Sequence, residues 1–295
     1  MQQESIYITE GEEQLHLRHI WQSKGGVPIF MLHGLIENGF IFYTEKGKGL
    51  ACYLAEQGFD VYVADLRGRG KSLPAINSQS TFGQHETITC DIALFLEKIQ
   101  SINPQKMHLI AHSWGGVLIS SFLARYPKWL DKVQSKTCFG TKRVVTAKTM
   151  EAYFKLGFMW RYIAPILAKK NGYFDAKKFR FGSDSETKKS LEESITWVIP
   201  GKWHDLNDGF DYYTAAQNIT WPPTWHLTGI SDYALGHQQD VQLFIDECNN
   251  RNAKFSVLSK QAGNQVNYDH INILTHPNTV NDHFPKLALW LKGFS

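Results

Sequence analysis

The chain has 295 residues, of which 43% are hydrophobic and 20% charged, a globular composition that argues against disorder. The formal net charge of +3 is too small to indicate nucleic-acid binding. No apolar run reaches the ~18 residues that a transmembrane segment needs.

The first residues and the cysteines bear on the expected location. Residues 1–5 have neither a basic start nor an apolar stretch, so we expect no secretory signal. Four cysteines are scattered without paired spacing: Cys52, Cys90, Cys138 and Cys248. Such spacing predicts reduced thiols rather than a disulfide framework or a cysteine zinc site. We therefore expect a cytoplasmic protein.

Short β-rich runs alternate with helical patterns over much of the chain. The predicted strands are residues 5–9, 14–21, 27–32, 59–64, 107–111, 225–228 and 254–258. The predicted helices include residues 51–57, 91–102, 117–126 and 286–291. This alternation predicts an α/β fold with a mostly parallel central sheet and helices on both faces.

The pattern changes at about residue 140. Residues 140–220 are rich in aromatic and basic side chains, and their apolar residues recur at helical steps. We predict a helical cap over residues 140–220, inserted into a core made of residues 1–139 and 221–295. One apolar line consists of Tyr153, Leu156, Trp160, Ile163 and Leu167. A second consists of Met150, Phe154 and Phe158, which we expect to bind substrate; packing within the insertion is the alternative.

Residues 107–116 combine an apolar strand, a turn at Ser113 and a small-residue helix. A nucleophile on such a strained turn needs small residues two positions before and after it, because strand and helix pack closely there. Gly115 meets this need, and Ala111 adds one methyl group to it. Ser113 is therefore the predicted nucleophile; a helix N-cap serine is the alternative interpretation.

A second turn, His33-Gly34-Leu35, follows the predicted strand 27–32. The backbone amides of Leu35 and Trp114 are the expected oxyanion donors. His33 is expected to form hydrogen bonds without transferring protons.

Residues 65–72 read Asp-Leu-Arg-Gly-Arg-Gly-Lys-Ser and imitate a phosphate-binding loop. That loop needs a glycine where Asp65 stands, and a carboxylate there would repel phosphate oxygens. We therefore expect a structural turn and no nucleotide.

A serine nucleophile needs a base, and the base needs a carboxylate that fixes its tautomer. Asp232 follows the predicted strand 225–228 and is the predicted acid. Its rivals, Asp240 and Asp246, fall in a helical pattern and are expected to face solvent. His270, in a loop beyond strand 254–258, is the predicted base. The other candidate bases are His237, His276 and His283.

Taken together, these motifs resemble the alpha/beta hydrolase superfamily. Residues 33–43, 232–241 and 268–274 are most similar to its acid-lipase branch. The resemblance implies the fold and a serine, aspartate and histidine set. It disfavours epoxide hydrolases and dehalogenases, which have an aspartate at the Ser113 position.

We therefore expect a serine hydrolase of esters that acts on a small-molecule ester or lipid-like substrate and needs no metal or organic cofactor. A peptidase, amidase or thioesterase with the same three residues, and a ligand-binding protein without turnover, are the alternatives. A peptidase would need an amine-binding carboxylate, for which the insertion offers Glu192, Glu193, Asp205 and Asp208.

Overall fold

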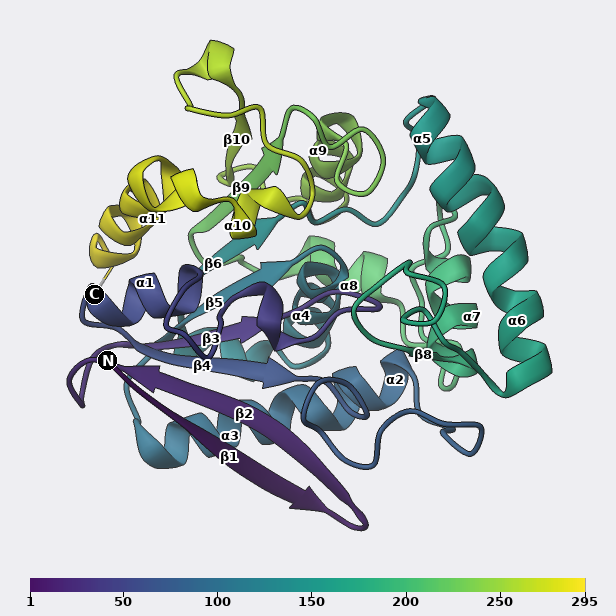
Figure 1. Ribbon diagram of the computed structural model, residues 1–295, viewed down its shortest axis with the longest axis horizontal. Coiled ribbons are helices and arrows are strands. Elements are labelled where there is room, and N and C mark those ends of the chain that lie inside the picture. Colours follow the sequence, from purple (N-terminus) through teal and green to yellow (C-terminus); the bar gives the residue numbers. More distant parts are fainter. Residues whose placement is uncertain (295) are drawn as a thin grey trace.

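An eight-stranded sheet runs through the computed structural model, which describes residues 1–294 apart from the side chains of Glu10, Lys155 and Leu156 (Figure 1). In chain order the strands are β1 (Gln2–Glu10), β2 (Glu13–Trp21), β3 (Pro28–Leu32), β4 (Asp60–Asp65), β5 (Met107–His112), β6 (Val133–Phe139), β9 (Thr224–Gly229) and β10 (Lys254–Leu258).

The spatial order of the strands is β1-β2-β4-β3-β5-β6-β9-β10. β1 and β2 pair antiparallel, as do β2 and β4, while all pairs from β4 to β10 are parallel. The predicted mostly parallel sheet is confirmed. The carboxyl ends of the parallel strands meet at one edge, where ligands bind in open sheets of this kind.

Helices cover both faces of the sheet, as predicted. One hydrophobic core lies under α1 (Leu50–Glu56) and α11 (His283–Lys292). The core on the other face includes α3 (Ile92–Ile102), α4 (Trp114–Arg125), α8 (Tyr212–Asn218) and α9 (Gln238–Glu247). β3 shows why a central strand of this sheet is apolar on both faces. Phe30 and Leu32 enter one core, and Ile29 and Met31 enter the other.

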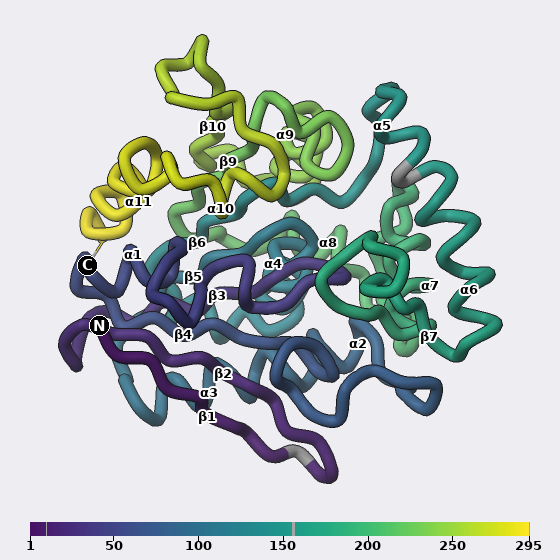
Figure 2. Tube along the Cα trace, in the orientation of Figure 1, coloured from purple at the N-terminus to yellow at the C-terminus, as the bar shows by residue number. Residues whose placement is uncertain are grey.

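Much of the chain between β6 and β9 lies beyond the carboxyl edge of the sheet, whereas α8 returns to the face covered by α4 (Figures 1 and 2). This part of the chain contains one long helix (residues 150–171), which consists of α5 (Met150–Ala152), a π-helical stretch (Tyr153–Ile163) and α6 (Ala164–Asn171). Two short paired strands follow, β7 (Tyr173–Phe174) and β8 (Glu186–Thr187), and then α7 (Lys188–Trp197).

This segment packs in two ways. Trp160 and Phe174 belong to a small core of their own between the long helix and α7. Trp197, Trp203 and Tyr212 instead join the main core beside α4.

Across residues 1–294, no helix combines the length and apolarity that crossing a bilayer requires.

Candidate active site

Ser113 forms the turn between β5 and α4 by itself, because the strand ends at His112 and the helix begins at Trp114. Its backbone has φ 52° and ψ −127°, values that residues with a side chain rarely adopt. Two hydrogen bonds hold it there. Ser113 N donates to the Phe139 carbonyl (2.7 Å), and Thr141 Oγ1 donates to the Ser113 carbonyl (2.9 Å). Such strain is common at functional sites.

Glycine is needed on both sides of the contact between this turn and the His33-Gly34-Leu35 turn. A Cβ at Gly115 would lie 2.4 Å from the His33 carbonyl oxygen, and one at Gly34 would lie 2.8 Å from Cβ of Ser113. Ala111, at the position where the motif usually has a glycine, is fully buried in the core. The two predicted turns therefore pack directly against each other.

His270 and Asp232 form a buried pair. His270 Nδ1 lies 2.6 Å from Asp232 Oδ2, while Gly236 N donates to the other carboxylate oxygen at 2.8 Å. Burial alone would raise the pKa of Asp232, but the charge and hydrogen bond of His270 outweigh it, so this pKa lies below its ordinary value. Because Asp232 accepts the hydrogen bond from Nδ1 of His270, Nε2 of the same ring is left for proton transfer.

The other candidates for the acid and the base have different hydrogen-bond partners. Asp240 is fully buried, contrary to our expectation of a solvated side chain, and accepts hydrogen bonds from the backbone and hydroxyl of Thr146. His283 is also buried, and its Nε2 donates to the Ile273 carbonyl (2.8 Å). His237 caps the start of α9 by accepting the Gln239 amide, and His276 caps a short 3-10 helix by accepting the Asn278 amide.

The two predicted oxyanion donors line the same pocket as Ser113 and His270. Among residues 1–294, neither the Leu35 nor the Trp114 backbone amide has an acceptor. His33 fixes the turn before Leu35. It donates from Nδ1 to the Gly34 carbonyl (2.8 Å) and accepts the Leu66 amide at Nε2 (3.0 Å). Burial lowers the pKa of His33, in agreement with a neutral ring that forms hydrogen bonds without transferring protons.

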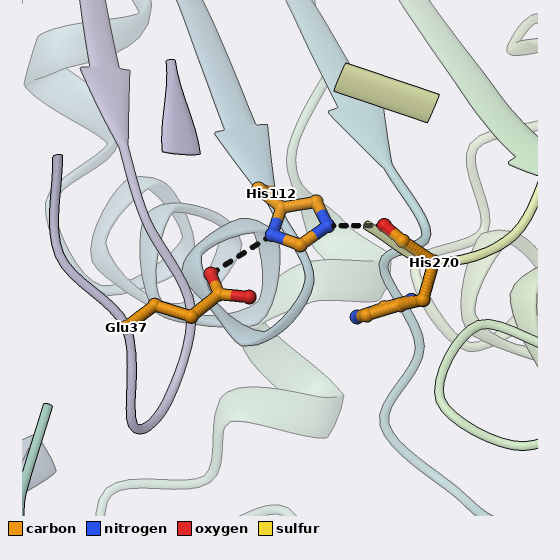
Figure 3. Close-up of side chains that lie close together, drawn as sticks. All are labelled: Glu37, His112 and His270. Atoms are coloured by element: carbon orange, nitrogen blue, oxygen red, sulfur yellow. Dashed lines mark hydrogen bonds and ion pairs between the residues drawn. The ribbon is translucent and has the colours of Figure 1, made fainter. Parts of the chain in front are cut away.

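Sequence reasoning missed a second histidine–carboxylate pair. His112 Nδ1 lies 2.8 Å from Glu37 Oε2, and its Nε2 lies 2.9 Å from the backbone carbonyl of His270 (Figure 3). The same Glu37 oxygen accepts the Gly34 amide at 2.9 Å. The signal in the sequence was a histidine that ends an otherwise apolar strand, although nothing local identified its partner.

The contacts of His112 define its charge. A carbonyl oxygen only accepts, so Nε2 carries a proton, and the Glu37 carboxylate requires another on Nδ1. Burial alone would lower the pKa of His112, but Glu37 outweighs it and raises this pKa above its ordinary value. Burial likewise opposes the ionised form of Glu37, yet the charge and hydrogen bond of His112 lower the pKa of Glu37 to about 2. We conclude that the two form an imidazolium–carboxylate pair.

Within the part of the chain that the structure describes, two clusters have the residue types of a metal site. In the first, Glu37, His112 and His270, both ring nitrogens of His112 carry protons and have no lone pair for a metal. The second cluster consists of His85, Asp205 and Asp208. The Arg125 guanidinium already bonds both of its carboxylates. Neither donor set is open to a cation.

The loop that imitates a phosphate site is filled by its own carboxylate. Asp65 is buried and accepts hydrogen bonds from the amides of Gly39 (2.7 Å) and Lys71 (2.9 Å) and from His16 (2.7 Å). A Cβ at Gly70 would lie only 2.2 Å from this carboxyl group. The geometry favours the structural turn that we predicted.

The shared pocket has a volume of about 620 Å³. Apolar side chains supply much of its wall: Leu35, Ile36, Phe40, Ile41, Trp160, Phe181, Val198, Leu235 and Ile271. The long helix contributes Trp160 to this wall. Met150, Phe154 and Phe158, which we expected to bind substrate, instead lie on the helix surface with 84%, 58% and 47% of their area exposed. They are not among the described residues that line the pocket.

The candidate amine-binding carboxylates also lie elsewhere. Glu193 accepts the Gln84 amide, Asp205 accepts from Tyr212, and Asp208 pairs with Arg125. Glu192 is exposed beside Lys188. Within the described part of the chain, none of the four carboxylates lines the pocket.

Comparison with known proteins identifies related chains. The family model of the alpha/beta hydrolase fold matches residues 27–259. A probable lysophospholipase L2 of Haemophilus influenzae is 29% identical over 120 residues, which are 40% of this chain and 37% of that protein. Triacylglycerol lipase 1 of Arabidopsis thaliana is 28% identical over 102 residues, which are 32% and 26% of the two chains. The chain thus matches less than half the length of either relative.

A solved structure resembles nearly the whole chain. It is that of a soluble variant of monoglyceride lipase from Saccharomyces cerevisiae, with a TM-score of 0.71 and 17% identity. The similarity covers 99% of this chain and 96% of that one. At this identity it establishes a common fold.

Proposed function

Because the chain belongs to the alpha/beta hydrolase family, we propose that it is a serine hydrolase of carboxylic esters that uses Ser113, His270 and Asp232. One observation carries the proposal. His270, joined to the buried Asp232 at 2.6 Å, lines the same pocket as Ser113, Leu35 and Trp114. The nucleophile, the base, the orienting acid and the oxyanion donors would thus all act on one substrate bound in this pocket.

In the proposed reaction, Ser113 Oγ attacks the acyl carbon while His270 Nε2 takes its proton. The carbonyl oxygen becomes an oxyanion that accepts from the amides of Leu35 and Trp114. His270 then protonates the departing alcohol, and an ester bond to Ser113 remains. Water, deprotonated by His270, then attacks the acyl carbon. The bond to Ser113 Oγ breaks, His270 returns the proton to this oxygen, and the acid is released. Asp232 stabilises the imidazolium in each half.

The free amides would contribute much of the rate. One oxyanion donor is worth about 2.7–4 kcal/mol where it has been measured. Because neither amide has an acceptor among residues 1–294, both could bind the oxyanion without first breaking a hydrogen bond.

The pocket and the relatives support an ester with a medium or long acyl chain. Its wall is largely aliphatic and aromatic, which suits an acyl chain better than a polar one. The matched relatives include a probable lysophospholipase, a triacylglycerol lipase and a methylesterase. We also propose a cytoplasmic location, which suits the buried thiols of Cys52, Cys138 and Cys248.

A fluorophosphonate probe tests the proposal against a ligand-binding protein without turnover. We expect covalent labelling of Ser113, located by peptide mapping, and faster hydrolysis of longer p-nitrophenyl esters than of the acetate. An unlabelled Ser113 in folded protein would support the binding protein. Hydrolysis of aminoacyl anilides in preference to esters would support a peptidase.

A further inference from the structure

The outer side of the long helix (residues 150–171) carries an unbroken line of exposed apolar side chains. They recur at every fourth position, with exposed fractions of 84%, 58%, 47%, 59% and 63%: Met150, Phe154, Phe158, Tyr162 and Ile166. Tyr153, which is 75% exposed, lies beside them. We call these six residues the outer line. A helix on the surface of a globular protein normally presents polar residues to water.

The packing of the helix does not depend on the outer line. Buried contacts come from its other side, where Trp160, Ala164 and Ala168 share a small core with Phe174 and Leu191. In Figure 1 the helix forms the edge of the molecule, with α7 on its inner side. The outer line is therefore a continuous apolar surface that a binding partner would cover.

The charged side chains beside the outer line indicate the chemistry of that binding partner. Four exposed cations flank or interrupt the outer line: Lys148, Arg161, Lys169 and Lys170. Glu151 is the one acidic residue in the sequence of the long helix. Apolar side chains bordered by cations are typical of helices that lie in the interface of an anionic membrane. A second copy of the chain would instead bring the same cations face to face.

The helix also borders the pocket. Trp160, on its inner side, is part of the pocket wall, as is Leu235 from the loop that follows Asp232. Thr149 Oγ1, at the helix start, donates to the Tyr233 carbonyl of that loop at 2.7 Å. Tyr233 is itself 51% exposed. A body that covers the outer line would thus lie next to the pocket.

We propose that the outer line docks onto a bilayer surface that contains anionic phospholipid, so that lipid esters reach the pocket from the bilayer. The docking stands on the exposed apolar residues and the cations alone, whereas the entry of a substrate rests on the proposed ester hydrolysis. The partner is a lipid surface, and binding combines apolar insertion with charge attraction.

Vesicle flotation tests the docking. The full chain is mixed with vesicles of phosphatidylcholine alone or of phosphatidylcholine and phosphatidylglycerol at two to one. We expect binding to the anionic vesicles that weakens with salt, and equally in the Ser113→Ala protein, since docking needs no turnover. Binding of Ser113→Ala would support docking even if ester hydrolysis failed.

Two variants separate the apolar and the electrostatic contributions to vesicle binding. Phe154→Ser/Phe158→Ser/Tyr162→Ser should weaken binding at least tenfold, and Arg161→Gln/Lys169→Gln/Lys170→Gln should remove the preference for anionic vesicles. Leu289→Ser is the matched control, because Leu289 on α11 is 71% exposed and lies outside the long helix. It should bind as the wild type does.

The substituted side chains are exposed, so thermal midpoints and kcat/KM for a short water-soluble ester should stay unchanged. If the triple serine variant lowers the midpoint, Met150→Ser, at the most exposed position, replaces it. Unchanged flotation of these variants, or no flotation of the wild type, would overturn the proposal. A wild-type dimer in light scattering that the serine variant converts to a monomer would also overturn it and assign the outer line to self-association.

Discussion

His112 and Glu37 are joined by a hydrogen bond of 2.8 Å between Nδ1 and Oε2 although 75 positions separate them in the sequence. Glu37 also accepts the amide of Gly34, next to the proposed oxyanion donor Leu35. His112 also donates to the carbonyl of His270. The ion pair thus connects the oxyanion turn with the loop of the proposed base (Figure 3).

Glu37→Gln should destabilise the protein far more than a glutamate substitution at the surface. It leaves His112 in a buried site without its counter-charge, and breaking a buried pair typically costs about 3–5 kcal/mol. Glu45→Gln is the matched control, because Glu45 pairs with Lys71 in solvent, where water and salt screen the pair, so its loss should change the unfolding free energy little. Urea unfolding of both variants measures the difference, and equal losses would contradict the buried ion pair.

The effect of Glu37→Gln should also depend on pH. Glu37 has its pKa lowered from 4.5 to about 2, so its contribution is complete above pH 4.5 and is lost as the pH falls toward 2. His112 has its pKa raised above 6.5, so its contribution is complete below pH 6.5 and is lost as the pH rises through the folded-state value. The difference in unfolding free energy between wild type and variant should therefore be largest between pH 4.5 and 6.5. A difference that does not vary from pH 3 to 9 would contradict this assignment.

Much of the site could be predicted because local chemistry marks it. An apolar run, a turn with small neighbours and a helix predict the geometry around Ser113, and the strand ends locate Asp232 and His270. The Glu37–His112 pair could not be predicted in this way. It depends on a contact between the end of β5 and the loop after β3, which only the assembled sheet brings together, since β3 and β5 are neighbours in space but not in sequence.

Ser113→Ala should abolish ester hydrolysis and leave the fold intact. The methyl group fits the same turn, but no other nucleophile is positioned beside His270 in the proposed mechanism. Loss of such a residue typically costs about 10⁴–10⁶ in kcat. Steady-state kinetics with a p-nitrophenyl ester measures the loss, and circular dichroism checks the fold. More than a tenth of wild-type activity in the variant would refute the assignment.

His270→Ala and His276→Ala should differ sharply. The first removes the ring held by Asp232 in the pocket, so kcat should fall by several orders of magnitude. His276 accepts the Asn278 amide at 3.1 Å, and its loss should cost stability of about 0.5–2 kcal/mol, as for other caps, with little change in kcat. If His276→Ala were the inactive variant, the proposed base would be wrong.

The long helix shows where sequence periodicity reaches its limit. Its spacing revealed more than one apolar line, but both lines contain large side chains, so period alone did not tell which one faces inward. The line that faces inward is neither of these: it consists of Trp160, Ala164 and Ala168, and its small residues let the helix approach α7 closely. Tyr153, from the first predicted line, is 75% exposed. Trp160, on that inner line, therefore takes the place in the pocket that we had expected for Phe158.

Trp160→Ala should weaken the binding of long-chain esters more than that of acetate esters. The indole forms part of the pocket wall, and each methylene that loses apolar cover gives up about 0.8 kcal/mol, or about fourfold in KM. Trp160 also packs against Phe174 and Phe181, so the variant should be less stable as well. The ratio of KM between octanoate and acetate esters, measured below the unfolding temperature, separates the two effects. Phe158→Ala is the control: its side chain is half exposed on the outer line, so this ratio should stay unchanged with esters dissolved as monomers. If Phe158→Ala raised the ratio and Trp160→Ala did not, the acyl chain would bind along the outer face of the helix.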